Sequence, residues 1–271
     1  MVEEGAQRLS RNHPLTAGNT RVKEARKLSR RSVRAERRLF LADGPKAVEG
    51  AQSVPDCVDE VFATPAAAEQ YADLAASGPA WTLVDERALA SLSDSVTPAG
   101  VVAVCRFLDG PVTDALASNR LAVICADVRD PGNAGTVIRT ADAAGADAVV
   151  LAGTSADAYN PKTVRATAGS LFHLPLAVEP DPLAAVTAAR EAGLTVLAAD
   201  VAGELDLDAA DDVLAGPTAW LFGNEARGLP AELAAAADHR VRIPIHGRAE
   251  SLNLSTAAAV CLYASARAQR A

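Results

Sequence analysis

The sequence contains few aromatic residues, only four cysteines and no long hydrophobic run. Aromatic side chains make up 4% of the 271 residues, although hydrophobic residues of all kinds make up 49%. Much of this hydrophobic fraction is Ala and Val, which suits a layered α/β packing better than an aromatic-rich β-sandwich. The length predicts two domains or one large domain, with a sizeable core.

The cysteines and the absent hydrophobic runs exclude several classes of protein. Cys57, Cys105, Cys125 and Cys261 are widely separated and form no C-x-x-C pair, so neither a disulfide framework nor a zinc site is indicated. No stretch of 18 apolar residues is present, and the N-terminus lacks the hydrophobic segment of a signal peptide. We therefore expect a cytoplasmic protein that needs no metal and does not act at a membrane.

Positive charge is concentrated near the N-terminus. Residues 8–38 contain 11 Lys or Arg against two Glu, a local charge of +9, whereas residues 39–271 contain 15 basic and 30 acidic residues, a charge of −15. A basic segment on an acidic body favours contact with a polyanion, although the same run could be the solvated face of a helix. Composition alone leaves both interpretations open.

The hydrophobic pattern divides the chain into two α/β domains. We expect a flexible N-terminus (1–18), a small domain (19–106) that begins with a basic helix and the strand 38–44, a linker (107–119) and a larger domain (120–271). In the larger domain near-continuous apolar runs alternate with helical segments, which predicts a mostly parallel sheet with helices on both faces. The expected strands are 120–128, 146–153, 172–178, 194–200, 218–224 and 240–245.

Three polar segments follow expected strands of the larger domain, where open parallel sheets bind ligands. In 127–147, Asn133 can cap a helix that carries Arg139, and neither common nucleotide-binding glycine motif is present. This argues against a nucleotide-dependent oxidoreductase. The ordinary explanation of the segment is a strand–turn–helix connection with a solvated arginine.

The second and third segments contain further polar candidates. In 221–229, Asn224 and Glu225 come directly after a buried strand and could bind a ligand or cap the next helix. In 243–259, Ser251 is a suitable N-cap for the final helix. Asn253, a poor helix former, is better explained by a polar contact than by packing.

Taken in order, these segments resemble a known family. N-x-G-x-x-x-R, F-G-N-E-x-x-G-L and I-P-x-x-G-x-x-x-S-L-N-x-S look like the three motifs of SpoU-type RNA 2′-O-ribose methyltransferases of the SPOUT superfamily, over about 130 residues. The N-terminal domain resembles the family's L30e-like substrate-binding domain, through residues 19–31 and 40–48. The resemblance spans nearly the whole chain.

The resemblance implies a fold, a cofactor and a dimer. The C-terminal domain would form a deep trefoil knot, a rare exception to unknotted topology, and would pair with a second copy, near the active site. S-adenosylmethionine would bind among the knot loops without a metal. The residues that match the family's cofactor site are Leu221, Gly223, Asn224, Ile243, Ile245, Leu252 and Asn253; Ile245 stands where the family commonly has Met.

The resemblance also implies the catalytic residues. Arg139 matches the family's key arginine, often described as the base that activates the ribose hydroxyl. Because arginine has no free acceptor, binding a phosphate and stabilising the developing alkoxide is a better-founded role. Asn133, Glu225, Ser251 and Asn253 would orient Arg139 and the ribose. His246, in the same loop as the third motif, suggests a general base, but the family pattern gives that position no such role.

The expected substrate is structured RNA, bound by the basic helix. Relatives with the L30e-like domain often modify large-subunit ribosomal RNA, which favours 23S rRNA and includes a self-resistance enzyme of the thiostrepton-resistance type. A tRNA methyltransferase and a non-catalytic knotted RNA-binding protein are the alternatives. The RNA-binding candidates are Arg21, Lys23, Lys27, Arg30, Arg31 and Arg34.

Overall fold

A computed structural model describes residues 13–270 as two compact units. The first unit extends to Leu108 and adds Tyr159–Phe172; the second consists of Asp109–Ala158 and the chain from His173 onward. Most of the segment 1–18, for which flexibility is expected, lies outside the described residues. No helix within 13–270 is long and apolar enough to cross a membrane.

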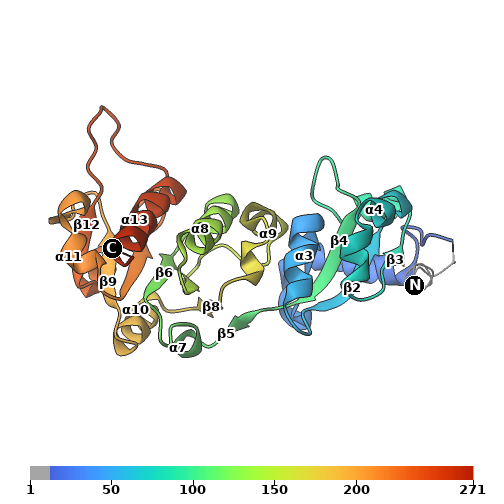
Figure 1. Ribbon diagram of the computed structural model, residues 1–271, viewed down its shortest axis with the longest axis horizontal. Helices are drawn as coiled ribbons and strands as arrows, with labels where there is room; N and C mark the ends of the chain where they lie inside the picture. Colours follow the sequence, from blue (N-terminus) through green and yellow to red (C-terminus); the bar gives the residue numbers. More distant parts are fainter. Residues whose placement is uncertain (1–12, 271) are drawn as a thin grey trace. The chain divides into compact units, whose positions relative to one another are not determined.

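The first unit contains a four-stranded sheet in the order β1-β4-β2-β3. Figure 1 labels its strands β2, β3 and β4. Strand β4 runs antiparallel to β1 and β2, and β3 runs parallel to β2. The strands are β1 Leu39–Asp43, β2 Val58–Ala63, β3 Thr82–Leu83 and β4 Val101–Arg106. The helices are α1 Thr20–Arg26, η2 Lys27–Ser29, α2 Arg31–Arg37, α3 Pro45–Ser53, α4 Pro65–Gln70, α5 Ala72–Ala76, α6 Glu86–Ala90, α9 Pro161–Thr167 and η3 Ser170–Phe172.

The basic segment forms two helices rather than the single basic helix expected at the start of the small domain. Arg30 is extended between η2 and α2, with φ −90° and ψ 128°. The buried Arg34 guanidinium donates hydrogen bonds of 2.8 Å to the carbonyls of Leu28 and Ser29, which the break leaves without helical partners. Arg34 therefore stabilises the break instead of facing RNA, which corrects its assignment as an RNA-binding residue.

The segment 159–172 packs within the first unit, although the sequence placed it in the larger domain. The Tyr159 ring lies 3.8 Å from that of Phe107 and 4.7 Å from that of Phe40, and its hydroxyl accepts a 2.7 Å hydrogen bond from the Leu108 amide. Phe172 stacks on Phe40. These rings hold α9 and η3 against the small sheet, as apolar contacts between aromatic side chains do.

The second unit contains an eight-stranded sheet in the order β10-β12-β9-β11-β6-β7-β8-β5, with every paired strand parallel. The predicted parallel α/β domain is thus confirmed. The strands are β5 Asp109–Gly110, β6 Leu121–Ala126, β7 Ala148–Ala152, β8 Leu176–Glu179, β9 Thr195–Ala199, β10 Leu205–Asp206, β11 Thr218–Phe222 and β12 His239–Arg242.

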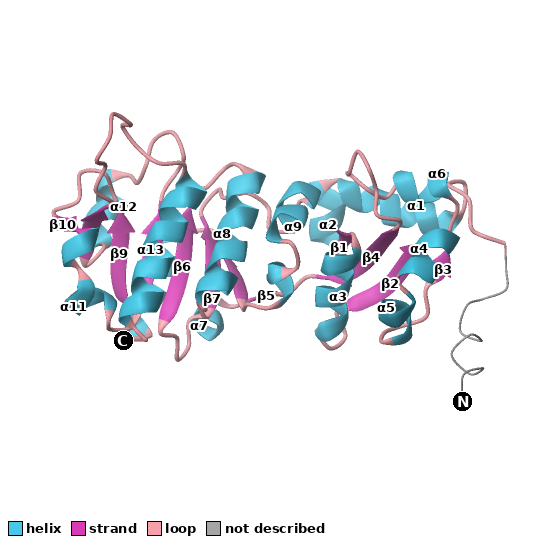
Figure 2. Cartoon of the chain, turned by 45° about the horizontal axis from the view of Figure 1, so that its top comes forward, coloured by secondary structure: helices cyan, strands magenta, loops and turns pink. Residues whose placement is uncertain are grey.

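Helices cover both faces of this sheet. Helices α8 and α13 lie side by side against β6 (Figure 2), and α7, α10 and α12 form a separate packed group. The buried Trp220 indole N–H donates to Ser265 Oγ at 2.9 Å, which anchors α13 to β11. The helices are α7 Val112–Ala115, α8 Pro131–Ala144, α10 Pro182–Glu191, η4 Leu207–Ala209, α11 Asp211–Leu214, α12 Ala231–Ala236 and α13 Leu254–Ala268.

Much of the segment expected to be a linker (107–119) belongs to the second unit. Strand β5 pairs with β8, and Ala115 and Leu116 at the end of α7 are buried in the hydrophobic core. Gly110 and Pro111 suggested an irregular connection, but a two-residue edge strand needs only backbone pairing and leaves no hydrophobic pattern in the sequence.

Candidate active site

The candidate site lies where the strand order of the large sheet changes direction. From β6 the chain proceeds through β7 and β8 on one side and then crosses to β9 and β11 on the other side, so β6 lies between β11 and β7. Ligands bind open parallel sheets at such points, beyond the carboxyl ends of the strands. The loops after β6 and β11 therefore meet at this edge.

The loop after β6 is fixed by its own side chains. Asp130, not Asn133 as expected, is the N-cap of α8, and its carboxylate accepts the Asn133 amide N–H at 2.9 Å. The helix starts at Pro131, a residue suited to the first helical position. This leaves the Asn133 side chain available for other contacts.

The loop after β11 is a tight turn closed by Asn224. Its backbone bonds to Gly228 in both directions, and its side-chain oxygen accepts the amides of Ala226 and Arg227. Its side-chain NH₂ donates to the Asp127 carbonyl at 2.9 Å, joining the two loops. Of the two roles considered for this segment, capping of the next helix is excluded, because α12 begins only at Ala231, after Pro230.

Glu225 also connects the two loops. Its carboxylate accepts the backbone N–H groups of Arg129 at 3.0 Å and Asp130 at 2.9 Å, and the Asn133 side-chain NH₂ at 3.3 Å. Partial burial acts to raise the pKa of this carboxyl, but these hydrogen bonds outweigh it and the pKa lies below its ordinary value of 4.5. Glu225 therefore holds the loop as an anion.

Asn253 extends this network to the third motif. Its side-chain NH₂ donates to Asn133 Oδ1 at 3.2 Å, while its own oxygen accepts the Ser255 and Thr256 amides. Asn253 is thus the N-cap of α13, and the expectation that Ser251 caps this helix is wrong. The polar contact expected for Asn253 is present. Glu225, Asn133 and Asn253 form a continuous hydrogen-bonded chain across all three motifs.

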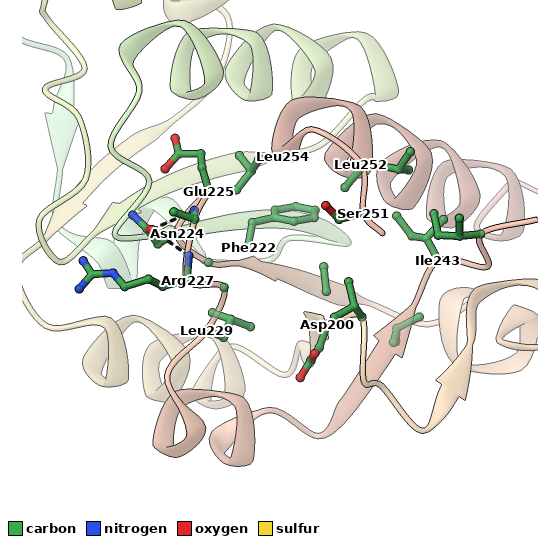
Figure 3. Close-up of a pocket in the computed structure, with 18 residues that line it drawn as sticks. Asp200, Phe222, Asn224, Glu225, Arg227, Leu229, Ile243, Ser251, Leu252 and Leu254 are labelled. Atoms are coloured by element: carbon green, nitrogen blue, oxygen red, sulfur yellow. Dashed lines mark hydrogen bonds between the residues drawn. The ribbon is translucent and has the colours of Figure 1, made fainter. Parts of the chain in front are cut away.

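A cavity of about 400 Å³ opens beside this network (Figure 3). Its walls combine apolar side chains with peptide groups and a few charged residues, as small-molecule sites do. Gly223 is required here, because a Cβ would lie 2.5 Å from the Gly228 carbonyl carbon. The lining residues are Ala199, Asp200, Val201, Phe222, Gly223, Asn224, Glu225, Ala226, Arg227, Gly228, Leu229, Val241, Ile243, Ile245, Ser251, Leu252, Leu254 and Ala257.

Five of the seven residues expected to contact a cofactor line this cavity: Gly223, Asn224, Ile243, Ile245 and Leu252. Leu221 is instead buried in the core, and Asn253 caps α13 beside the cavity. The sequence did not single out Ala199, Asp200 and Val201. Their signal was the end of the apolar run 194–200, which places them at the same edge of the sheet.

Among the expected catalytic residues, Asn133, Glu225 and Asn253 are joined by hydrogen bonds and Ser251 lines the cavity. Arg139 is separate from both. It is exposed on α8, does not line the cavity, and makes no hydrogen bond or ion pair within residues 13–270. Its guanidinium is therefore available to a ligand that approaches from solvent. His246 is exposed in the loop before α13 and does not line the cavity either.

Replacing Glu225 with Gln should loosen the network. A carboxylate accepts from both the Arg129 and the Asp130 N–H groups, whereas an amide NH₂ cannot accept. The free energy of unfolding at pH 7 should therefore fall by on the order of 1 kcal/mol. Because the folded-state pKa is lowered, the carboxylate contribution is present above the ordinary glutamate pKa and is lost as the pH falls through the folded value. Urea unfolding should show the difference shrinking below about pH 4.5.

The matched control for this variant is Glu191→Gln, an exposed glutamate at the end of α10. It should behave as wild type throughout. A difference between Glu225→Gln and wild type that grows toward low pH would contradict the proposed anchoring.

Comparison with known proteins identifies the family. The profile of the SpoU rRNA methylase family matches residues 120–263, the region that contains the whole network and the cavity. The chain belongs to the SpoU rRNA methylase family. The profile of the MRM3-like substrate-binding domain matches residues 19–103, within the first unit.

Several similar proteins match nearly the whole chain. The Bacillus subtilis 23S rRNA (guanosine(2553)-2′-O)-methyltransferase RlmP is 34% identical over 92% of this chain and 96% of its own. An AdoMet-bound rRNA methyltransferase from Sinorhizobium meliloti is similar in structure, with a TM-score of 0.80 and 36% identity over 92% of this chain and 95% of that chain. The AdoMet complex of AviRb from Streptomyces viridochromogenes gives a TM-score of 0.82 and 30% identity over 93% and 99%.

Proposed function

We propose that this protein transfers a methyl group from S-adenosylmethionine to a ribose 2′-hydroxyl of 23S rRNA. The observation that carries the proposal is the hydrogen-bonded chain Glu225–Asn133–Asn253 beside the cavity, formed from all three motifs of a SpoU methylase. Full-length relatives support it, since RlmP is named a 23S rRNA 2′-O-methyltransferase and two similar structures are named as AdoMet-bound.

The residues that line the cavity suit the chemical groups of the cofactor. Phe222, Ile243 and Leu252 supply apolar surface for an adenine, and Gly223 allows the tight turn 223–229 in the cavity wall because its missing Cβ leaves room for the Gly228 backbone. Asp200 places a carboxylate among the lining groups, which suits hydroxyl or ammonium donors. When bound there, S-adenosylmethionine would supply a methyl group already activated by a sulfonium.

The residues of the network would position the ribose. Glu225 and Asn253 hold Asn133 from two sides, so the loop after β6 and the start of α13 keep a fixed separation. Such fixed geometry lowers the barrier by aligning nucleophile and methyl group before reaction. Ser251 presents a hydroxyl to the same cavity.

Arg139 would act on the RNA side of the reaction. Its exposed guanidinium has no partner among the described residues and can bind a phosphate next to the target ribose in a bidentate manner. The same positive charge would stabilise the developing alkoxide as the hydroxyl loses its proton. This role needs only the charge and the fork geometry of arginine.

RNA binding is assigned to the exposed basic residues of the first unit. Lys23, Arg30 and Arg31 are exposed and make no ion pair with a described residue, whereas Arg21 pairs with Glu60 and Lys27 with Glu24. Free cations contribute most to phosphate contact because they release counterions without first breaking an ion pair.

Replacing Lys23, Arg30 and Arg31 together with Ala should weaken RNA binding and leave cofactor affinity unchanged. Each lost phosphate contact should lower the salt slope of log K by about 0.9, as measured by filter binding of a 23S rRNA transcript at several salt concentrations. Lys46→Ala is the control, because Glu49 already neutralises that lysine. An unchanged salt slope in the triple variant would place the RNA surface elsewhere.

Methyl transfer from labelled S-adenosylmethionine tests the function directly. Purified protein is incubated with 23S rRNA, 16S rRNA and tRNA transcripts, and the methylated nucleotide is mapped. We expect incorporation into 23S rRNA at one ribose. Incorporation into tRNA alone would establish the alternative substrate, and none in any RNA would favour a non-catalytic binding protein.

We further propose a homodimer that works in the cytoplasm, where ribosomal RNA is modified. Val260 and Tyr263 expose apolar surface on α13, at 38% and 54% of their area, which suits burial against a second copy. A mass of one chain in light scattering at micromolar concentration would overturn the dimer. The trefoil knot that the resemblance implies stays a prediction.

A further inference from the structure

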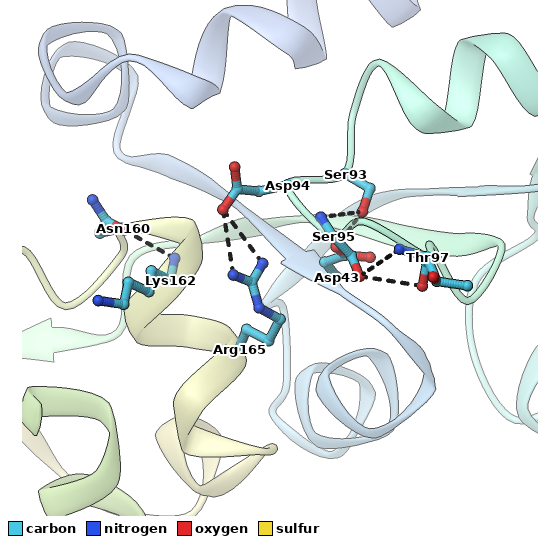
Figure 4. A network of polar contacts seen from close by, with 8 residues as sticks. All are labelled: Asp43, Ser93, Asp94, Ser95, Thr97, Asn160, Lys162 and Arg165. Carbon is cyan, nitrogen blue, oxygen red and sulfur yellow. Dashed lines mark hydrogen bonds and ion pairs between the residues drawn. The ribbon is translucent and has the colours of Figure 1, made fainter. Parts of the chain in front are cut away.

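The first unit contains a second cavity, of about 350 Å³, which shares no residue with the network described above. Its walls come from four separate places in the sequence: the end of α1 with η2, strand β1, the turn after α6 and the start of α9. Figure 4 shows Ser93 and Asp94 of the turn after α6 and Asn160 at the start of α9. The lining residues are Arg26, Ser29, Leu41, Ser91, Leu92, Ser93, Asp94, Asn160 and Pro161.

The cavity is lined by both hydrogen-bonding and apolar side chains. The Ser29 hydroxyl and the Asn160 NH₂ group can donate to a ligand. The Ser91 and Ser93 hydroxyls already donate within the unit, to the Ala88 carbonyl and to Asp43, and can still accept. Leu41 and Leu92 are buried and apolar. Nucleobases need this combination, because their faces are apolar and their edges carry donors and acceptors. The cavity volume is within the range of small-molecule sites.

Several wall residues are held in place by the unit itself. The Ser93 hydroxyl donates to Asp43 and accepts the Ser95 amide at 3.0 Å, and Arg165 pairs with Asp94 at 3.4 Å. Asn160 Oδ1 accepts the Lys162 amide at 2.9 Å as the N-cap of α9. Its NH₂ group makes no hydrogen bond with a described residue and remains available to a ligand.

The charge at the cavity favours a phosphate. Asp94 is paired with Arg165, whereas the exposed Arg26 makes no ion pair with a described residue. Ser29, a lining residue, is followed directly in the chain by the exposed Arg30 and Arg31, so further positively charged side chains come immediately after the cavity wall in the basic segment. A nucleotide in the cavity could therefore remain connected to a backbone bound by these residues.

We propose that this cavity binds one unstacked nucleotide of the RNA substrate, with its phosphate on Arg26 and its base edge on Asn160 and the serine hydroxyls. The inference rests on the proposed RNA-modifying function. Single-stranded bases splayed out of a folded RNA are the usual targets of specific recognition, because their edges are free. The cavity would thus add selectivity to the non-specific attraction of the basic residues.

Two variants test the cavity without disturbing the fold. Asn160→Asp keeps the capping oxygen of α9 and replaces the free NH₂ by an anionic oxygen. Ser29→Trp fills the cavity from an exposed position, and the Ser29 carbonyl that Arg34 contacts is unchanged. Their matched controls are Gln70→Glu, an exposed amide-to-carboxylate change on α4 outside the cavity, and Ser77→Trp, the same substitution at an exposed serine that does not line the cavity.

The readout is the affinity of each full-length variant for a 23S rRNA transcript at fixed salt, with S-adenosylmethionine affinity and thermal unfolding measured in parallel. Both test variants should bind RNA about five- to twentyfold more weakly, as loss of a base contact does, with cofactor affinity and unfolding unchanged. The controls should bind within about twofold of wild type. In 4-thiouridine-substituted transcript, photo-crosslinks should map to 91–94 or 160–161.

The possible failures are distinguishable. Wild-type affinity in both test variants, together with crosslinks confined to other peptides, would overturn the cavity proposal and leave the methyltransferase function intact. If the wild-type protein neither binds nor methylates the rRNA transcript, the proposed function fails and the cavity proposal fails with it.

Discussion

Replacing Arg139 with Ala should reduce methyl transfer about 10²–10³-fold, the usual cost of removing one group that stabilises developing charge. The guanidinium is exposed and lies outside the cavity lining, so S-adenosylmethionine affinity should stay at the wild-type value. Single-turnover methylation of 23S rRNA gives the rate, and calorimetry gives the cofactor affinity. A loss of both would mean that Arg139 acts on the cofactor site.

Two further variants identify what Arg139 contributes. Arg139→Lys keeps the positive charge without the bidentate fork and should recover part of the lost rate if the role is electrostatic. Arg267→Ala removes another exposed arginine of the second unit, whose pair with Asp211 is fully at the surface, and should change little. If the lysine variant is as inactive as the alanine variant, the reaction needs the bidentate geometry of the guanidinium as well as its charge.

Replacing Gly223 with Ala should weaken S-adenosylmethionine binding at least tenfold. The added Cβ would lie 2.5–2.6 Å from backbone atoms of Gly228 and Leu229, and no side-chain rotation can relieve this contact. The turn 223–229 must shift, which breaks the Asn224–Gly228 pairing and moves Glu225. We expect a stability loss of about 1–3 kcal/mol, as for other overpacked sites.

Gly216→Ala is the matched control for this variant. A Cβ at Gly216 would lie 3.7 Å from the nearest atom, the Val213 carbonyl oxygen, which is an ordinary contact. Cofactor affinity and thermal unfolding of this control should match wild type. If Gly223→Ala binds S-adenosylmethionine normally, the cavity beside Gly223 is not the cofactor site.

Local sequence patterns predicted the large sheet well and the helix ends less well. Apolar runs located strands β6, β7, β9 and β11, because strands buried on both faces must be hydrophobic throughout. The N-caps of α8 and α13 were misplaced: Asn133 and Ser251 are plausible caps, but Asp130 and Asn253 occupy those positions. Several polar residues near a helix start can serve as caps, and the loop geometry selects among them.

The sequence could not show which polar residues would meet. Glu225, Asn133 and Asn253 come from motifs up to 120 positions apart, and their contacts depend on the strand order β9-β11-β6. Arg34 looked like its basic neighbours, yet it is buried against two carbonyls at a break between helices. This burial depends on how α2 packs, and the pattern of charges in the sequence carries no information about that packing.

By itself the sequence determined the three SpoU motifs and their order, the position of each motif directly after an apolar strand, and the basic N-terminal segment. These are local features, fixed by residue identity and spacing. The tertiary structure alone decided that the motifs are joined through Glu225, Asn133 and Asn253, and that α9 forms a wall of the cavity near Arg26. The reason is physical: both sites consist of contacts between segments distant in the chain, and only the packed sheets bring those segments together.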